Sequence, residues 1–220
     1  MLTADLINKN IPRLQLQDTI GKALQLIIDF RVSHLPVVAD KKFLGLLSEE
    51  DLLDQDDERL TIETLQKNFI PDSVLVTVHF LNAVNFSIQH DANIVPVVNA
   101  SMDFIGVITT PDLLKTLGNF SGADEIGGLI VLEMERSQFA ISEISRIVES
   151  NDSHILHLNT QVNADNGLLT LTLHINNREI APVVATFERY DYLVTYSFGT
   201  QSLHDEVNAN YDHLIKYLDI

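Results

Sequence analysis

The sequence predicts an α+β protein of two domains, in which a duplicated unit is followed by a βαββαβ domain. The first observation is a repeat, because HLPVV at residues 34–38 and IVPVV at residues 94–98 lie 60 residues apart. The second is a change in the order of the apolar patterns after residue 124. The third is composition, since 220 residues with 45% hydrophobic content suffice for two packed cores.

The duplicated unit covers residues 1–120, as one copy at about 1–60 and a second at 61–120. In each copy, apolar residues with helical spacing precede a proline-containing strand, and a second strand follows after a turn. The expected elements are a helix around residues 23–28, strands at 35–38 and 43–47, a helix from Ser48, and the same four elements at 83–88, 94–98, 104–108 and Thr109. Because a unit of that size buries little surface alone, the copies should pack together as one domain.

Each copy places a hydroxyl and a carboxylate three residues apart, where the second strand runs into a helix. The first copy has Ser48 and Asp51 in GLLSEEDLL, and the second has Thr109 and Asp112 in GVITTPDLL. Ser and Thr are favoured helix N-caps, and an aspartate in the first turn complements the helix dipole. Capping therefore accounts for each pair taken singly. It does not account for the glycine three residues before each hydroxyl, which permits a close approach to the backbone.

The segments HLPVVADKKFLGLLSEEDLL and IVPVVNASMDFIGVITTPDLL resemble a pair of cystathionine-beta-synthase (CBS) domains, often called a Bateman module. The resemblance implies two clefts that bind adenosine-containing ligands: AMP, ADP, ATP or S-adenosylmethionine. It assigns the ribose hydroxyls to Asp51 and Asp112, since a carboxylate accepts from two vicinal hydroxyls. It places the phosphates near Ser48 and Thr109. Since clefts in that family combine one copy's motif with the other copy's strand, His34 is expected near the second motif.

The two clefts are expected to differ in charge. Two glutamates lie inside the first motif, and four more acids follow within residues 54–58. This charge should repel a polyphosphate unless Mg²⁺ accompanies it. The second motif has few acids and Lys115 one turn on, so a phosphorylated ligand is expected at the Asp112 cleft. The Asp51 cleft should be empty or take a less anionic ligand. For His34 the alternative is an ordinary core or solvent-facing histidine.

Residues 125–220 form the second predicted domain, after a linker at 118–124. The apolar patterns predict a strand at 128–136, a helix at 141–148, strands at 154–162 and 169–175, a helix at 180–187 and a strand at 192–198. Asn166-Gly167 predicts the hairpin between the two middle strands. This βαββαβ order is ferredoxin-like and resembles an ACT domain, a regulatory module that binds small molecules and is often dimeric.

Two further features of this domain bear on its role. The turn at residues 135–139 lacks the glycine that is usual in amino-acid-binding ACT domains, which puts amino-acid binding in doubt. The spacing of Val207, Tyr211, Leu214 and Leu218 predicts a final helix with one apolar face. We therefore expect this domain to act as a pairing platform in a homodimer.

Composition disfavours several classes of function. The net charge of −17 argues against nucleic acid and anionic membranes as partners. No apolar run approaches the roughly 20 residues of a membrane span, and the N-terminus lacks the pattern of a secretion signal. The absence of cysteine excludes a disulfide scaffold and a thiolate metal site. A cytoplasmic location is expected.

No catalytic constellation is found, so the protein is not expected to be an enzyme and has no candidate catalytic residue. A metal site is not expected either, because His154 and His157 would point to opposite faces of a strand. We therefore expect a regulatory protein without a resident cofactor, which acts through an unidentified target protein or through its own homodimer. The alternative is a structural or oligomerisation module that has lost its ligand.

Overall fold

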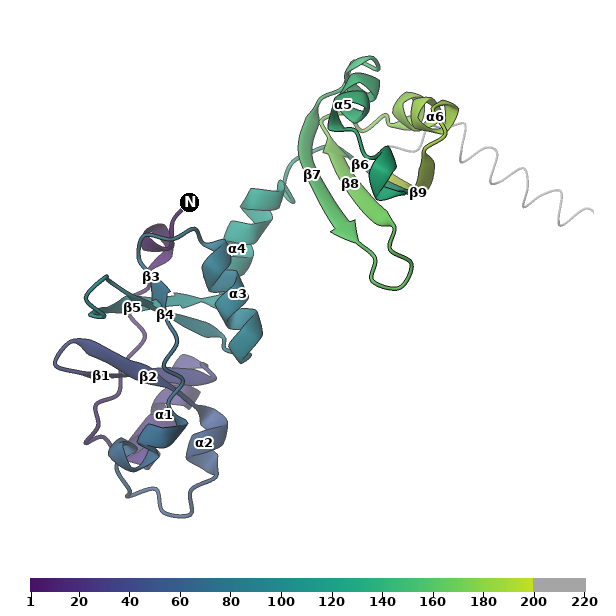
Figure 1. Cartoon of the computed structure of the whole chain (residues 1–220). Helices are drawn as coiled ribbons and strands as arrows, with labels where there is room; N and C mark the ends of the chain where they lie inside the picture. The colour runs from purple at the N-terminus through teal and green to yellow at the C-terminus, as the bar shows by residue number, and fades with distance from the viewer. Residues whose placement is uncertain (200–220) are drawn as a thin grey trace, which may run out of the picture. The chain divides into compact units, whose positions relative to one another are not determined.

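The computed structural model describes residues 1–199. These residues form two compact units, Met1–Leu117 and a second that begins at Gly118, and Figure 1 shows the elements of each. The fold class is confirmed, because both units combine helices with β-sheets. The final helix predicted at 207–218 lies outside the described residues.

The first unit contains two small sheets flanked by helices. Its elements in chain order are η1 (Thr3–Leu6), α1 (Ile20–Phe30), β1 (His34–Ala39), β2 (Lys42–Ser48), α2 (Glu49–Leu53), η2 (Ile62–Asn68), β3 (Val74–Leu75), α3 (Leu81–His90), β4 (Ile94–Val98), β5 (Phe104–Thr109) and α4 (Thr110–Ser121). Strands β1 and β2 form one sheet, and β3, β4 and β5 form the other. One apolar core runs through both copies, so they fold as a single body.

The two copies share their strand register and their bulge. The antiparallel pair β1–β2 sets Val37 opposite Gly45, and its register shifts just after Val37. The pair β4–β5 sets Val97 opposite Gly106 and shifts just after Val97. Val38 pairs with Phe43 and Val98 pairs with Phe104, so the second copy has one more residue between these partners, which explains why the spacing between equivalent positions changes from 60 to 61.

In each copy, the second strand pairs with a segment that crosses it (the crossing segment), and this segment comes from the other copy. The backbones of Ile70 and Leu46 donate to each other at 2.8 Å, so the segment after η2 pairs with β2 of the first copy. At the equivalent place in the second copy, Asn8 pairs with Val107 on β5. The segment that crosses the second copy is therefore the N-terminal one, about 100 residues away in sequence.

These crossings explain the glycine that precedes each motif. A Cβ atom on Gly45 would lie 2.6 Å from Cβ of Phe69, and one on Gly106 would lie 2.6 Å from Cγ2 of Ile7. Real Cβ atoms do not approach other atoms so closely, so any side chain would push the crossing segment away. What approaches the glycine backbone is another part of the chain.

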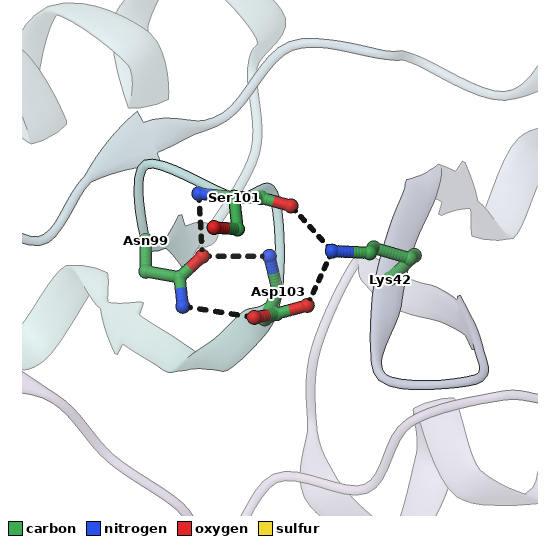
Figure 2. Close-up of polar contacts among 4 residues, drawn as sticks. All are labelled: Lys42, Asn99, Ser101 and Asp103. Carbon is green, nitrogen blue, oxygen red and sulfur yellow. Dashed lines mark hydrogen bonds and ion pairs between the residues drawn. The ribbon is translucent and has the colours of Figure 1, made fainter.

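Polar contacts join the two copies at equivalent positions. Lys42 donates through Nζ to the carbonyl of Ser101 and to Oδ1 of Asp103, both at 2.6 Å, and Figure 2 shows this cluster. The side-chain oxygen of Asn99 accepts from the backbone amides of Ser101 and Asp103 at 2.9 Å and so shapes the turn. The Lys42 ammonium, and then the Asn99 amide, lower the pKa of the Asp103 carboxyl below its usual value. The rings of Phe43 and Phe104 stack beside this contact, with centroids 6.3 Å apart.

The described part of the second unit is a four-stranded antiparallel sheet covered by two helices. Its elements are β6 (Gly128–Met134), η3 (Arg136–Gln138), α5 (Ile141–Glu149), β7 (Ile155–Val162), β8 (Leu169–Ile175), α6 (Ala181–Arg189) and β9 (Leu193–Phe198). The strand order is β7-β8-β6-β9, which is the ferredoxin-like order for a βαββαβ chain. Alternate residues of β6 are buried, and Figure 1 shows α5 and α6 on the same side of this sheet.

Two local predictions meet different outcomes. The hairpin at Asn166-Gly167 forms as expected, with Gly167 in a left-handed conformation at a φ of 72°. The linker predicted at 118–124 is wrong in its first half, because α4 continues to Ser121. A Cβ on Gly118 would meet nothing within 4 Å, so this glycine does not interrupt the helix, and the chain turns at Gly122 with a φ of 63°.

Across residues 1–199, none of the helices combines the length and the apolar character needed to span a bilayer.

Candidate ligand-binding site

The Ser48–Asp51 pair sits at the start of α2. The Ser48 hydroxyl accepts from the backbone amide of Asp51 at 3.0 Å, which is the capping contact that the sequence predicts. The same hydroxyl donates to Oδ2 of Asp51 at 2.5 Å. The other carboxylate oxygen, Oδ1, accepts from the side-chain amide of Asn68 at 2.6 Å. Both oxygens of Asp51 therefore have a donor within the chain.

The Thr109–Asp112 pair repeats both contacts of the hydroxyl at the start of α4. Thr109 donates through Oγ1 to Oδ2 of Asp112 at 2.6 Å, and the amide of Asp112 approaches the same hydroxyl at 3.4 Å. Among residues 1–199 the structure contains no hydrogen-bond donor to Oδ1 of Asp112. This carboxylate is oriented by the threonine and keeps one oxygen available to a ligand.

In both copies the hydroxyl has two roles. It accepts from a helix amide through a lone pair, and its proton goes to the motif carboxylate. Capping and orientation of the carboxylate are thus parts of one arrangement. A carboxylate fixed in this way can accept a charge-assisted hydrogen bond from a ligand hydroxyl.

His34 is buried at the start of β1, with 7% of its surface exposed. Its Nδ1 lies 2.8 Å from the Ser33 hydroxyl, and its backbone is in register with Ser48. Burial lowers the pKa of His34 below the usual 6.5, while the nearby carboxylates of Asp51 and Asp91 act in the opposite direction. Burial therefore favours the neutral imidazole.

The described contacts of His34 thus connect it with the first motif. No contact between His34 and the Thr109–Asp112 pair is found among residues 1–199, so that placement stays a prediction. At the end of α3, the rings of Phe86 and His90 contact each other with centroids 4.5 Å apart, and Nε2 of His90 lies 3.2 Å from Oδ2 of Asp72.

The acidic run after the first motif carries little internal compensation. Arg59 pairs with Asp57 at 3.0 Å, and both side chains are well exposed. Within residues 1–199, no group of three or more His, Asp or Glu side chains is arranged to hold a metal ion.

Sequence reasoning missed Asn68, which contacts Asp51 from 17 residues away in the chain. It also missed the contact between Ser33 and Asn93, where the amide of Ser33 donates to Oδ1 of Asn93 at 2.8 Å. The second contact had a signal, because these polar residues occupy equivalent positions 60 residues apart. Asn68 had no such signal, because the residue at the equivalent place beside the second motif is Leu6, which is not polar.

A known protein family matches the first copy. Residues 4–58 match the family model described as the CBS domain. This agrees with the resemblance drawn from the first of the two motif segments.

Among solved structures, the chain is similar to a CBS domain pair/ACT domain protein from Thermotoga maritima, with 22% identity, 55% of this chain and 98% of that chain covered, and a TM-score of 0.49. It is also similar to the CBS domains of a transcriptional regulator from Streptococcus pneumoniae, with 23% identity, 52% and 98% coverage, and a TM-score of 0.46. A third is CBSX2 in complex with AMP, with 20% identity, 54% and 97% coverage, and a TM-score of 0.46. At these identities the ligands and partners of those proteins do not transfer to this chain.

Proposed function

We propose that this protein is a regulatory protein that binds an adenosine-containing ligand at the Thr109–Asp112 pair. The observation that carries the proposal is the Asp112 carboxylate, which Thr109 orients through one oxygen while the other remains available. The ligands proposed are AMP, ADP, ATP and S-adenosylmethionine. The binding of a polyphosphate should depend on Mg²⁺ more at the Asp51 motif, because the acids of residues 54–58 follow it.

The chemistry of the pair suits a nucleoside. The vicinal hydroxyls of ribose are donors, and the available oxygen of Asp112 is a charged acceptor. Lys115 lies on α4 one turn after the pair and supplies a cation for an anionic group of the ligand. A charged acceptor and a nearby cation bind and orient a ligand, so the function proposed is recognition rather than catalysis.

Calorimetric titration of the full-length chain with AMP, followed by ADP, ATP and S-adenosylmethionine, tests this function. Binding is expected with the wild type and should be weakened in Asp112→Ala. Asp29→Ala is the matched control, because Asp29 lies on α1 and its carboxylate bonds to Gln25. Unchanged affinity in Asp112→Ala would refute the site, and no binding of any of the four ligands would refute the function.

A second candidate, a structural or oligomerisation module, is favoured by a different observation. Ile28, Ile88, Leu53 and Leu114 are between 65% and 74% exposed, and they lie on α1, α3, α2 and α4. The members of each pair, Ile28 with Ile88 and Leu53 with Leu114, occupy equivalent positions in the two copies. An apolar surface repeated in this way suits an isologous homodimer.

Both candidates can hold at once. A ligand that binds two dimer arrangements unequally would shift their populations, and the ACT-like unit or an unidentified target protein would receive the signal. Light scattering at micromolar concentration tests the dimer. Ile88→Asp is expected to give a monomer near the chain mass of 24.7 kDa, and a wild type that is already monomeric would remove this candidate.

A further inference from the structure

The two motif carboxylates differ in one internal partner. Asp51 accepts from Ser48 and from Asn68, whereas Asp112 accepts from Thr109 alone among the described residues. The difference therefore comes from Asn68, whose side-chain nitrogen lies 2.6 Å from Oδ1 of Asp51.

The register of the crossing segments identifies the residue that takes the place of Asn68 in the second copy. Asn68 is the last residue of η2, and Leu6 is the last residue of η1. The next residue in each case contacts the motif glycine, Phe69 at Gly45 and Ile7 at Gly106. Position 68, beside the first motif, is therefore equivalent to position 6, beside the second motif.

Leu6 has no side-chain donor, and it packs against the core of the first unit. Asn68 is exposed, but its position is held by the residues that follow it, because Ile70 exchanges two backbone hydrogen bonds with Leu46. The amide of Asn68 is thus presented to Asp51 by an anchored segment.

We propose that Asn68 is an internal substitute for a ligand hydroxyl, which closes the Asp51 site and confines adenosine-ligand binding to Asp112. This inference rests on the proposed function. The amide occupies the carboxylate oxygen that a ribose hydroxyl would need, so a ligand at Asp51 must first displace it. A hydrogen bond to a charged group corresponds to roughly a 10- to 100-fold factor in affinity.

Asn68→Leu is the decisive variant, because it places beside Asp51 the same side chain, leucine, that occupies the equivalent position beside Asp112. The matched control is Gln66→Leu, which makes the same kind of change at an exposed amide on the same segment. Asn68→Ala is the second variant, in case an exposed leucine lowers solubility. All are measured in the full-length chain by calorimetric titration with AMP.

The wild type and Gln66→Leu are expected to bind one AMP per chain, and Asn68→Leu two. In an Asp112→Ala background, Asn68→Leu should raise AMP affinity at least about tenfold, and a further Asp51→Ala should abolish the gain. These results support the role of Asn68.

Other outcomes separate this inference from the proposed function. One AMP bound by the wild type and by both Asn68 variants would overturn the role of Asn68 and leave the function standing. Two AMP bound by the wild type would do the same. No binding by the wild type with one AMP bound by Asn68→Leu would support the role of Asn68 and overturn the function at Asp112. No binding by any of the proteins would overturn both.

Discussion

The two copies of the repeat have the same backbone and different polar groups. Their strands share one register and one bulge, and a crossing segment passes over the same glycine in each. At the motif, one carboxylate has two side-chain donors within residues 1–199 and the other has one. The two copies thus share the backbone geometry around the motif, and they differ in the side chain that reaches the motif carboxylate.

The largest effect is expected at the glycine under the crossing segment, which both copies share. Gly106→Ala and Gly45→Ala would each force a Cβ to within 2.6 Å of the crossing segment. Overpacking of this kind should lower the free energy of unfolding by about 1–3 kcal/mol in both copies. Gly118→Ala is the control, because its Cβ meets nothing within 4 Å and alanine favours a helix. Urea denaturation measures all three, and a tolerated Gly106→Ala would contradict the role given to the crossing.

The next effect concerns the part that differs. Asp112→Ala should weaken the binding of AMP by about 1.5–3 kcal/mol, the range for hydrogen bonds to a charged group. Asp51→Ala should leave AMP binding nearly unchanged, because its oxygens are already occupied by Ser48 and Asn68. Calorimetry on the two variants measures the contrast. Equal losses in both would show that the two copies bind alike.

A pH-dependent effect distinguishes the copies at the start of their proline-containing strands, where the first has His34 and the second has Ile94. Burial keeps the pKa of His34 below 6.5 in the folded state. The neutral imidazole therefore contributes stability that is fully present above pH 6.5 and is lost as the pH falls towards the folded-state pKa. His34→Ile should reduce the loss of unfolding free energy below pH 6.5. An unchanged pH profile would contradict it.

The smallest effect concerns the contact between the copies. Lys42 lowers the pKa of Asp103, so the pair contributes stability above the usual carboxyl pKa of 3.8 and loses it as the pH falls through the lowered value. Lys42→Met should return the pKa of Asp103 towards 3.8 in an NMR titration. Because both groups are largely solvated, little change in unfolding is expected at pH 7. A pKa that stays depressed would show that Asn99, not Lys42, sets it.

Most of the elements follow from local patterns in the sequence. The repeat and the apolar spacing are sufficient to predict β1, β2, β4 and β5, and the alternation in Leu169–Ile175 is sufficient to predict β8. The N-cap roles of Ser48 and Thr109 also follow, because capping depends on neighbours within one turn.

The exchange of crossing segments does not follow from such patterns. The bonds between Asn8 and Val107 join backbone groups, and backbone groups leave no trace in the choice of side chains. Gly106 indicates that some group approaches the backbone closely, but the sequence does not identify that group. The role of Asn68 depends on that crossing, so it could not be predicted before the crossing was known.

The exchanged segments also have a consequence for the order in which the chain can fold during synthesis. The strand β2 of the first copy can pair with its crossing segment early, since Ile70 follows its partner Leu46 by only 24 residues. The segment that contains Asn8 is made before its partner Val107, which lies about 100 residues later on β5. Residues 3 and 4 can pair sooner, because their backbone amides donate to the carbonyls of Val78 and Val76. The pairing of Asn8 has to wait for β5, and it closes a loop that spans most of the first unit.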